Sequence, residues 1–449
     1  RNLERLIILL QREIMILNPR TRVREIRTFS NELRTLAAIN KLESMPLSDI
    51  ETRQGRMLRI AVENAYRQVP HYKETFKAAG VSPGDVRSVD DLYKLPMLTK
   101  EEVLAGFPDR IMSHSFPMKD AFHSESSGTS GMKCTYLTDW PTRDANFALL
   151  YRARSLFGFR PRHLEYRFTW WPHSKGRWFH RIGFQRWVSS NVRNPPEENV
   201  RRLLETSPDC IYGRPFYLHL LSSLLSSEEN GNLDPVLVLA TGEVMDSRMK
   251  EDISEGFNAP AVNQYGCAEH NFLASECPEE RRLHLNMLDT VIEVVPDGEG
   301  TTKGERGEIL ITQLTNKAMP LIRYRLGDVA IVAEDECSCG RHGDLLSIIQ
   351  GRKDDMIRTR DGRELPPELF SSTVWMPGIK GSMIIQERID RIVIKIVTDG
   401  LDPAKRELIV SEFRRVLGDP DAEIDLVPVD VIQPDRSGKR RLVISKVPR

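Results

Sequence analysis

The chain lacks an excess of charge of either sign, because its 64 lysines and arginines balance 64 aspartates and glutamates. Nucleic-acid binders usually carry a basic excess that neutralises phosphates, so we expect no nucleic-acid partner. No stretch approaches the roughly 20 consecutive apolar residues that a membrane span needs. The 449 residues are 40% hydrophobic and 29% charged, which predicts a soluble globular protein with one large and one smaller domain.

Cysteine is also scarce, with six residues in the chain. So few and so unevenly spaced cysteines exclude a secreted disulfide framework and favour a reducing, cytoplasmic setting. The sequence begins at Arg1 without a signal-peptide pattern, and we expect a trimmed or incomplete N-terminus. Apolar residues at helical spacing over residues 3–17 predict a helix packed on the core, which we favour over contact with a membrane surface. The alternative, contact with a membrane surface, is based on a local basic excess: positions 1–60 contain 12 basic and 7 acidic residues.

Alternation of helical and strand-like segments predicts an α/β fold. Helical spacing marks residues 53–66, 90–103, 200–204, 215–225 and 403–417, and β-rich runs mark 236–240, 290–295, 308–312, 329–332, 383–386, 389–398 and 423–431. A polar run at residues 351–355 precedes a segment of the size of a small domain. We therefore predict a large N-terminal domain over residues 1–350, mostly helical over residues 1–110, and a small α+β domain over residues 351–449.

One loop is rich in hydroxyl groups and glycine: residues 124–133 read Ser-Glu-Ser-Ser-Gly-Thr-Ser-Gly-Met-Lys and lead into a predicted strand at residues 134–137. Such a loop can bind phosphate oxygens through uncovered backbone N–H groups, hydroxyl donors and a nearby cation. Its glycine spacing is not that of a Walker loop. By itself the pattern also fits an ordinary surface loop.

Four further segments follow this loop in order: Tyr-Gly-Cys-Ala-Glu at residues 265–269, Arg-Tyr-Arg-Leu-Gly-Asp at 323–328, Gly-Arg-Lys-Asp-Asp-Met-Ile at 351–357 and Pro-Asp-Arg-Ser-Gly-Lys at 434–439. Together the five segments resemble the adenylate-forming superfamily of acyl-CoA synthetases, luciferases and adenylation domains. The nearest branch is the phenylacetate:CoA ligase-like group, including its capsular-polysaccharide-biosynthesis relatives. The resemblance implies a large adenylate-forming domain with helix-flanked β-sheets and a small mobile C-terminal lid domain.

Site residues follow from the resemblance, segment by segment. In the loop, the signature that holds the ATP phosphates is matched by Ser126, Ser127, Gly128, Thr129, Ser130 and Gly131, whereas Lys133 lies one place later than expected. The remaining implied residues are Tyr265 and Gly266 beside adenine, Glu269 for Mg²⁺, Asp328 for the ribose hydroxyls, Arg352 for the nucleotide, Asp354 as hinge and Lys439 as mobile catalytic lysine. The alternatives are an ordinary loop carboxylate at Glu269, a salt bridge from Asp328 to Arg323 or Arg325, and a solvated surface lysine at Lys439.

The implied reaction has two steps. A carboxylic acid attacks ATP to give an acyl adenylate and pyrophosphate, and the acyl group then passes to a thiol, which in close relatives belongs to coenzyme A. Residues 360–366 depart from the phenylacetate ligase pattern and resemble the capsule-biosynthesis branch. Three alternatives remain: transfer to an amine or a carrier-protein thiol, a degenerate nucleotide-binding homologue, and a membrane-surface scaffold. A homodimer is compatible with all of them.

A second cluster of residues has metal-ligand character: Cys277, His284, Cys337 and Cys339, with His342 as a substitute ligand. Three thiolates and one imidazole suit a closed structural Zn²⁺ site, and some relatives look similar here and carry zinc. The alternative is a pair of loops with reduced thiols.

For the acyl pocket we expect the residues before Tyr265 and the aromatic stretch 168–171 to contribute, although large aromatic residues are more often core. Trp170, Trp171 and Trp178 are the candidates, and residues 212–215 and 241–243 resemble family segments near the acyl and adenine sites.

Overall fold

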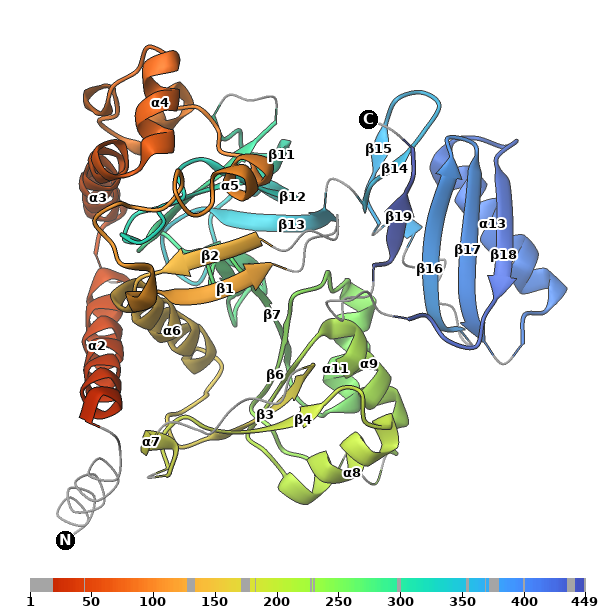
Figure 1. Ribbon diagram of the computed structural model, residues 1–449. Helices are drawn as coiled ribbons and strands as arrows, with labels where there is room; N and C mark the ends of the chain where they lie inside the picture. Colours follow the sequence, from red (N-terminus) through yellow and green to blue (C-terminus); the bar gives the residue numbers. More distant parts are fainter. Residues whose placement is uncertain are drawn as a thin grey trace, which may run out of the picture.

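The computed structural model shows the chain as two sheet-containing parts joined after the strand β13 (Figure 1). It describes residues 19–43, 45–126, 134–170, 178–181, 183–226, 228, 231–296, 300–352, 355–367, 369–370, 379–398, 400–433 and 441–447. Several predicted residues lie outside this part of the chain: the helix at 3–17, Ser127 to Gly131 of the loop, Lys133, Trp171, Asp354 and Lys439.

The first part of the chain is helical. It comprises α2 (Pro19–Glu43), α3 (Leu47–Gln68), α4 (Pro70–Ala78), η1 (Pro83–Asp85), η2 (Val89–Lys94), α5 (Lys100–Gly106) and η3 (Met118–Asp120). The helical spacing over residues 90–103 belongs to two separate elements, divided at the breaker Pro96. A 3-10 turn ends at Lys94, Pro96 interrupts the chain, and α5 starts anew behind the N-cap Thr99, whose hydroxyl accepts from the backbone N–H of Glu102 at 3.2 Å. The apolar spacing continues across a proline that no helix interior tolerates.

The hydroxyl-rich loop joins two strands of a hairpin, β1 (Phe122–Ser126) and β2 (Cys134–Thr138), which pair antiparallel. Helix α6 (Trp140–Ser155) follows directly. Asp139 caps it, because its carboxylate accepts from the backbone N–H of Thr142 at 2.9 Å and so satisfies a free donor of the first turn. The two strands flank the predicted phosphate loop in the sequence.

The large sheet has eleven strands among the described residues, in the order β10-β11-β12-β13-β9-β8-β7-β6-β5-β3-β4. Its parallel half contains β3 (Leu164–Thr169), β4 (Arg186–Asn191), β5 (Cys210–Gly213), β6 (Leu237–Thr241) and β7 (Ala261–Tyr265), with α7 (Trp178–Arg181), α8 (Pro196–Thr206), α9 (Pro215–Leu224) and α11 (Ser247–Gly256) between them. Its antiparallel half contains β8 (Ala274–Glu276), β9 (Leu283–Leu285), β10 (Thr290–Val295), β11 (Arg306–Gln313), β12 (Tyr324–Val332) and β13 (Leu345–Arg352). The parallel half is where ligands usually bind, outside the carboxyl ends of the strands.

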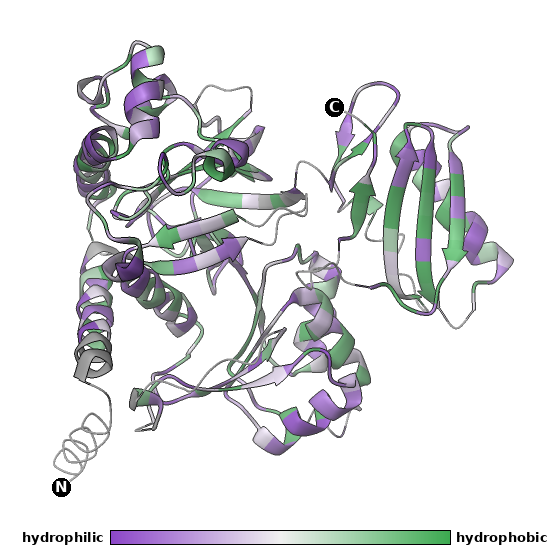
Figure 2. Ribbon diagram, in the orientation of Figure 1, coloured by the Kyte–Doolittle hydropathy of each residue, from purple (hydrophilic) through white to green (hydrophobic). Residues whose placement is uncertain are grey.

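The C-terminal segment builds its own sheet, in the order β18-β17-β16-β19. Its elements are β14 (Ile357–Arg358), β15 (Glu364–Leu365), β16 (Ile379–Arg388), β17 (Arg391–Thr398), α13 (Pro403–Leu417), β18 (Glu423–Pro428) and β19 (Val443–Ser445). Buried and partly buried residues alternate along β17, which is largely hydrophobic (Figure 2), and its buried isoleucines pack with Phe413 of α13. This independent core is what a small α+β domain requires.

An ion pair links the C-terminal segment to the large sheet. Arg306 of β11 lies 3.6 Å from a carboxylate oxygen of Glu364 in β15, which pairs with β14 in a two-stranded sheet. The α/β fold class is confirmed, with β-sheets, flanking helices and a C-terminal domain. The exact division at residue 351 stays a prediction. Across the described residues, no helix combines the length and the apolar character needed to cross a membrane.

Candidate nucleotide and acyl site

Three residues from three separate sequence segments meet at the edge of the large sheet. The hydroxyl group of Tyr265, the last residue of β7, donates to a carboxylate oxygen of Asp328 at 2.7 Å. Arg352 is the cross-strand partner of Asp328 in the β12–β13 ladder, and its Nε lies 3.6 Å from the other carboxylate oxygen. The sequence separates these residues by up to 87 positions, and the sheet brings them together.

Burial and charge act together at this triad. Burial and the neighbouring Asp328 carboxylate raise the pKa of Tyr265 well above its usual value, so the phenol stays a hydrogen-bond donor. Burial lowers the pKa of Arg352, but the carboxylates of Asp328 and Glu269 outweigh it and raise the pKa overall. The site therefore holds a fixed cation between two carboxylates.

Arg323 and Arg325 form salt bridges with other carboxylates and not with Asp328. Nη2 of Arg323 lies 3.1 Å from the Glu293 carboxylate, and Nη2 of Arg325 lies 2.6 Å from the Glu308 carboxylate. Both arginines therefore have a structural role within the sheet.

Glu269 lies in the loop that follows β7, and the loop needs a glycine at its start. A Cβ on Gly266 would lie 2.2 Å from the backbone oxygen of Asn271, which no real side chain tolerates. The Glu269 carboxylate contributes, after burial, to the raised pKa of Tyr136 and Tyr324, whose hydroxyl groups lie 2.8 Å apart. The Glu269 carboxylate thus acts electrostatically on this tyrosine pair and on Arg352.

Two polar side chains hold this loop from outside it. The amide of Gln313, at the end of β11, donates to the backbone oxygen of Glu269 at 2.8 Å, and the hydroxyl group of Ser124 in β1 donates to the backbone oxygen of Ala268 at 2.8 Å. Sequence reasoning missed the role of Gln313, since no motif marks it. Ser124 lies in the predicted loop but was assigned no contact.

Gln313 is itself fixed by a buried network. Its side-chain oxygen accepts from the amide of Asn316 at 3.0 Å and from the backbone N–H of Leu321 at 3.3 Å. The Asn316 amide also donates to the backbone oxygen of Leu137 in β2 at 2.9 Å. The strand after the phosphate loop and the loop of Glu269 are thereby joined through two buried side chains.

At the phosphate loop, the structure describes Ser126, the last residue of β1. Its hydroxyl oxygen is buried and has no hydrogen-bond partner in the described chain.

Next to the predicted hinge residue, Asp355 and Arg441 form an ion pair that joins this segment to the residues just before β19. Neighbouring Lys439 and Asp354 are outside the described residues.

The residues expected near the acyl pocket line the carboxyl ends of the parallel strands. The hydroxyl group of Thr241, at the end of β6, donates to the backbone oxygen of Gln264 at 2.7 Å, and the Glu243 carboxylate lies 3.6 Å from Arg214. Trp170 follows β3, and the guanidinium group of Arg193 lies 5.2 Å from its ring centre. Tyr212 lies in β5, and burial raises the pKa of its phenol.

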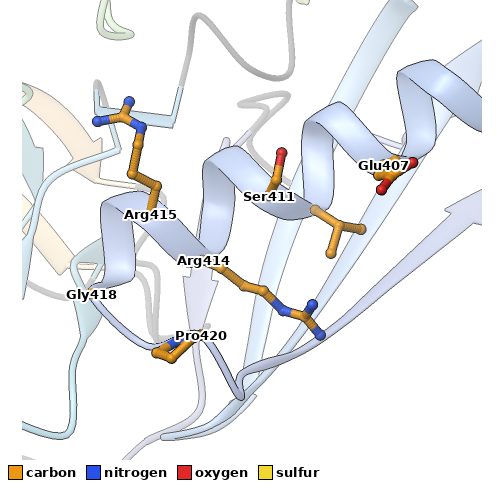
Figure 3. Close-up of a pocket in the computed structure, with 7 residues that line it drawn as sticks. Glu407, Ser411, Arg414, Arg415, Gly418 and Pro420 are labelled. Atoms are coloured by element: carbon orange, nitrogen blue, oxygen red, sulfur yellow. The ribbon is translucent and has the colours of Figure 1, made fainter.

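A pocket on α13, lined by Arg414, Arg415 and their neighbours, contains none of the predicted site residues (Figure 3).

The four cysteine and histidine residues predicted as a cluster do gather, between the loop after β8 and the loop before β13. Their ligand atoms all lie within 4.8 Å of one another. The sulfur atoms of Cys277 and Cys337 are 3.4 Å apart, and Nε2 of His284 is 3.4 Å from the sulfur of Cys339. His284 belongs to the cluster, so the substitute ligand His342 is not required.

The electrostatics of this cluster favour metal-binding protonation states for two of its members. Burial, aided by Arg341 and Arg282, lowers the pKa of His284 to about 4, which keeps the imidazole neutral. Burial raises the pKa of the Cys277 thiol, but the backbone N–H of Glu280 and other donors outweigh it, and the pKa is lowered overall. Burial raises the pKa of Cys337 to about 12 when no cation is present. A cation between these sulfurs would reverse that effect.

Comparison with known proteins places the chain among ligases. The family model "CapK C-terminal domain" matches residues 357–446. A phenylacetate-coenzyme A ligase of Thermus thermophilus is 27% identical, with 87% of this chain and 88% of the relative covered, and one of Escherichia coli is 28% identical over 76% and 79%. Protein CapK of Staphylococcus aureus is 23% identical over 47% of this chain and 46% of its own length. Over most of its length the chain is thus similar to phenylacetate-coenzyme A ligases, and its C-terminal part matches the CapK family model.

A solved structure agrees with this assignment at the level of fold. A 2-hydroxyisobutyryl-CoA ligase in the postadenylation state has a TM-score of 0.77 at 21% identity, with 91% of this chain and 92% of that chain covered. The chain thus has the fold of this ligase. The family predicted from the sequence is confirmed.

Proposed function

We propose that the protein activates a carboxylic acid with ATP to an acyl adenylate and then transfers the acyl group to coenzyme A. The observation that carries this proposal is the meeting of Tyr265, Asp328 and Arg352 at the sheet edge. A carboxylate with two oxygens can accept from both ribose hydroxyls at once, and such charge-assisted hydrogen bonds are strong. The relatives named phenylacetate-coenzyme A ligases support the reaction class.

In the first step, an oxygen of the substrate carboxylate attacks the α-phosphorus of ATP. The bond from that phosphorus to the bridging oxygen breaks, and pyrophosphate leaves. Catalysis is then a matter of alignment and charge stabilisation. We assign Ser126 to Gly131 to the β- and γ-phosphates and Lys439 to the charge that develops between the carboxylate and the α-phosphate. Glu269 would hold Mg²⁺, which neutralises phosphate charge when bound.

In the second step, a thiol attacks the acyl carbon, and AMP leaves. We infer that the small domain turns about Asp354 between the steps, withdrawing Lys439 and admitting the thiol. Coenzyme A is the acceptor that the relatives favour. An amine or a carrier-protein thiol is the second candidate, because residues 360–366 depart from the phenylacetate ligase pattern.

We further propose that Cys277, His284, Cys337 and Cys339 hold a structural Zn²⁺. Four donor atoms of suitable chemistry lie within 4.8 Å of one another, and no other ligand is needed for a closed tetrahedral site. The ion would tie the loop after β8 to the loop before β13, both of which border strands of the large sheet.

The decisive experiment is a pyrophosphate-exchange screen over aryl, fatty, hydroxy and amino acids, followed by thioester detection with coenzyme A. Acid-dependent exchange and thioester formation are expected. Exchange without thioester would favour the amine or carrier-protein acceptor. ATP binding without exchange for any acid would favour the degenerate homologue and contradict the proposal.

A further inference from the structure

Tyr136 of β2 and Tyr324 of β12 form a buried pair of phenols. Their hydroxyl oxygens lie 2.8 Å apart, and the two residues are 2% and 1% exposed. The rings meet edge to face, with their centres 6.1 Å apart. Each phenol has one proton, and only one of the two protons can lie between the oxygens. The pair therefore has a second proton to donate elsewhere.

That second proton needs an acceptor, because a buried donor without one is costly. Within the described part of the chain, the two hydroxyl groups are bonded to each other, and the thiol of Cys134 is a further hydrogen-bonding group beside Tyr136. A thiol sulfur is only a weak acceptor. A stronger acceptor is therefore expected near the pair.

The loop that contains Glu269 provides such an acceptor. Ser124 is the cross-strand partner of Tyr136 in the β1–β2 hairpin, so that the two side chains lie on the same face. The Ser124 hydroxyl group donates to the backbone oxygen of Ala268, the residue before Glu269, at 2.8 Å. Burial raises the pKa of both tyrosines, and the Glu269 carboxylate is the second cause for each of them. A charged acceptor thus acts on both phenols.

We propose that the tyrosine pair donates its second proton to one carboxylate oxygen of Glu269 and thereby leaves the other oxygen for Mg²⁺. Tyr136 and Tyr324 are then positioning residues, because they act on the ion only through Glu269. The inference rests on the proposed function, since it assumes that Glu269 holds the ion that binds with ATP.

The same hydrogen bond would also select the ion. Mg²⁺ is small and requires octahedral geometry with short bonds, whereas Ca²⁺ accepts bidentate carboxylates in a larger and more flexible shell. A carboxylate oxygen that accepts from a phenol is not available for bidentate binding. The pair therefore favours Mg²⁺ over Ca²⁺ at Glu269.

The test is the divalent-ion dependence of ATP binding, measured by calorimetry without any acid. In the double variant Tyr136→Phe/Tyr324→Phe we expect the Mg²⁺ concentration for half-maximal ATP binding to rise by about 10-fold or more, as for other lost outer contacts of metal ligands. The preference for Mg²⁺ over Ca²⁺ should fall in the same assay. The Kd for AMP without a divalent ion should stay the same, because we assign AMP contacts to Asp328 and Arg352 and not to this pair.

The double variant distinguishes positioning from packing. Replacing both partners of a buried hydrogen bond by apolar groups of the same shape can be nearly neutral for stability, whereas replacing one partner leaves the other unpaired. A tyrosine pair that is bonded only to itself would therefore give a double variant with unchanged Mg²⁺ dependence and unchanged ion preference. That result would overturn the inference.

Tyr72→Phe is the matched control. Tyr72 is 1% exposed, and its hydroxyl group donates to the backbone oxygen of Pro320 at 2.9 Å and accepts from the backbone N–H of Ile322 at 2.9 Å. Loss of this phenol should lower Tm by about 2 °C and leave the Mg²⁺ dependence unchanged. An equal change of the Mg²⁺ dependence in Tyr72→Phe would overturn the inference, because it would be a general effect of losing a buried phenol.

The outcomes also separate this inference from the function on which it rests. Mg²⁺-dependent ATP binding that the double variant leaves unchanged would overturn the role of the tyrosine pair alone. ATP binding by the wild-type protein that Mg²⁺ does not affect would contradict the assigned role of Glu269 and this inference with it.

Discussion

The amide nitrogen of Gln313 lies 2.8 Å from the backbone carbonyl oxygen of Glu269 and donates to it. This bond fixes the main chain at the residue to which we assign Mg²⁺ and does not involve its carboxylate oxygens. Because Gln313 is 1% exposed and also bonded to Asn316, the support is rigid. Outer contacts of this kind orient metal ligands and affect metal affinity.

We therefore predict that Gln313→Leu raises the Mg²⁺ concentration for half-maximal pyrophosphate exchange by about 10-fold. The KM for the acid should change little, since the acid does not contact this residue. Gln386→Leu is the control, because it removes an equally buried amide from the small sheet and should leave the Mg²⁺ dependence unchanged. An unchanged Mg²⁺ dependence in Gln313→Leu, despite lost stability, would make Gln313 a packing residue only.

Asp328→Asn should weaken nucleotide binding. The change keeps the shape but replaces one acceptor oxygen by a donor, so that the residue can no longer accept from Tyr265 and both ribose hydroxyls. We expect the KM for ATP and the Kd for AMP to rise by about 10- to 100-fold, the size of a lost charge-assisted hydrogen bond. Steady-state kinetics and calorimetry measure these values. Asp252→Asn, which changes a residue of α11 that forms a partly buried pair with His219 of α9, should change neither; equal effects would argue against a nucleotide contact at Asp328.

From the cluster of Cys277, His284, Cys337 and Cys339 we predict that purified protein contains about one zinc ion per chain, which elemental analysis measures. Cys337→Ser should reduce the zinc content and lower Tm, because it opens a closed four-ligand site. Cys210→Ser is the matched control: this thiol is also buried but lies in β5, outside the cluster, so the zinc content should stay the same. Retention of full zinc content in Cys337→Ser would contradict the proposed ligand set.

Most of the fold and the family could be predicted from the sequence, because motif residues such as Tyr265 and Asp328 carry their chemistry in a recognisable order. The role of Gln313 could not. It contributes through strand register and burial, and a glutamine within a strand has the same local pattern whether its amide is bonded or not. The apolar spacing over residues 90–103 likewise does not reveal where one turn ends before Pro96 and where Thr99 starts the next helix.

A pH-dependent contribution to stability is expected from Glu165, which is buried between two arginines. Burial raises the pKa of Glu165, but Arg154 and Arg167, with bonds of 3.1 and 2.7 Å, outweigh it, so the folded pKa lies below the unfolded value. The stabilisation is thus present above the unfolded pKa and is lost as pH falls through the folded pKa. Glu165→Gln should lower the free energy of unfolding by about 3 kcal/mol at pH 7, because it leaves buried guanidinium groups uncompensated. Urea unfolding should show this difference to be constant above about pH 5.5 and to shrink as pH falls below the unfolded pKa of about 4.3; a difference that stays constant down to about pH 3 would contradict the prediction.

Lys439→Ala should separate the two chemical steps. If the lysine acts only while the carboxylate attacks the α-phosphorus, pyrophosphate exchange should fall by about 100-fold or more, as for other lost transition-state contacts. Transfer of the acyl group from a supplied acyl adenylate to coenzyme A should keep its rate, because the lysine is withdrawn in that step. Lys446→Ala tests for a general effect on the small domain, since this lysine forms an exposed pair with Glu387 at 2.8 Å. Both half-reactions should proceed normally in that control. Equal losses of both half-reactions in Lys439→Ala would show that the lysine supports the fold of the small domain rather than the adenylation step.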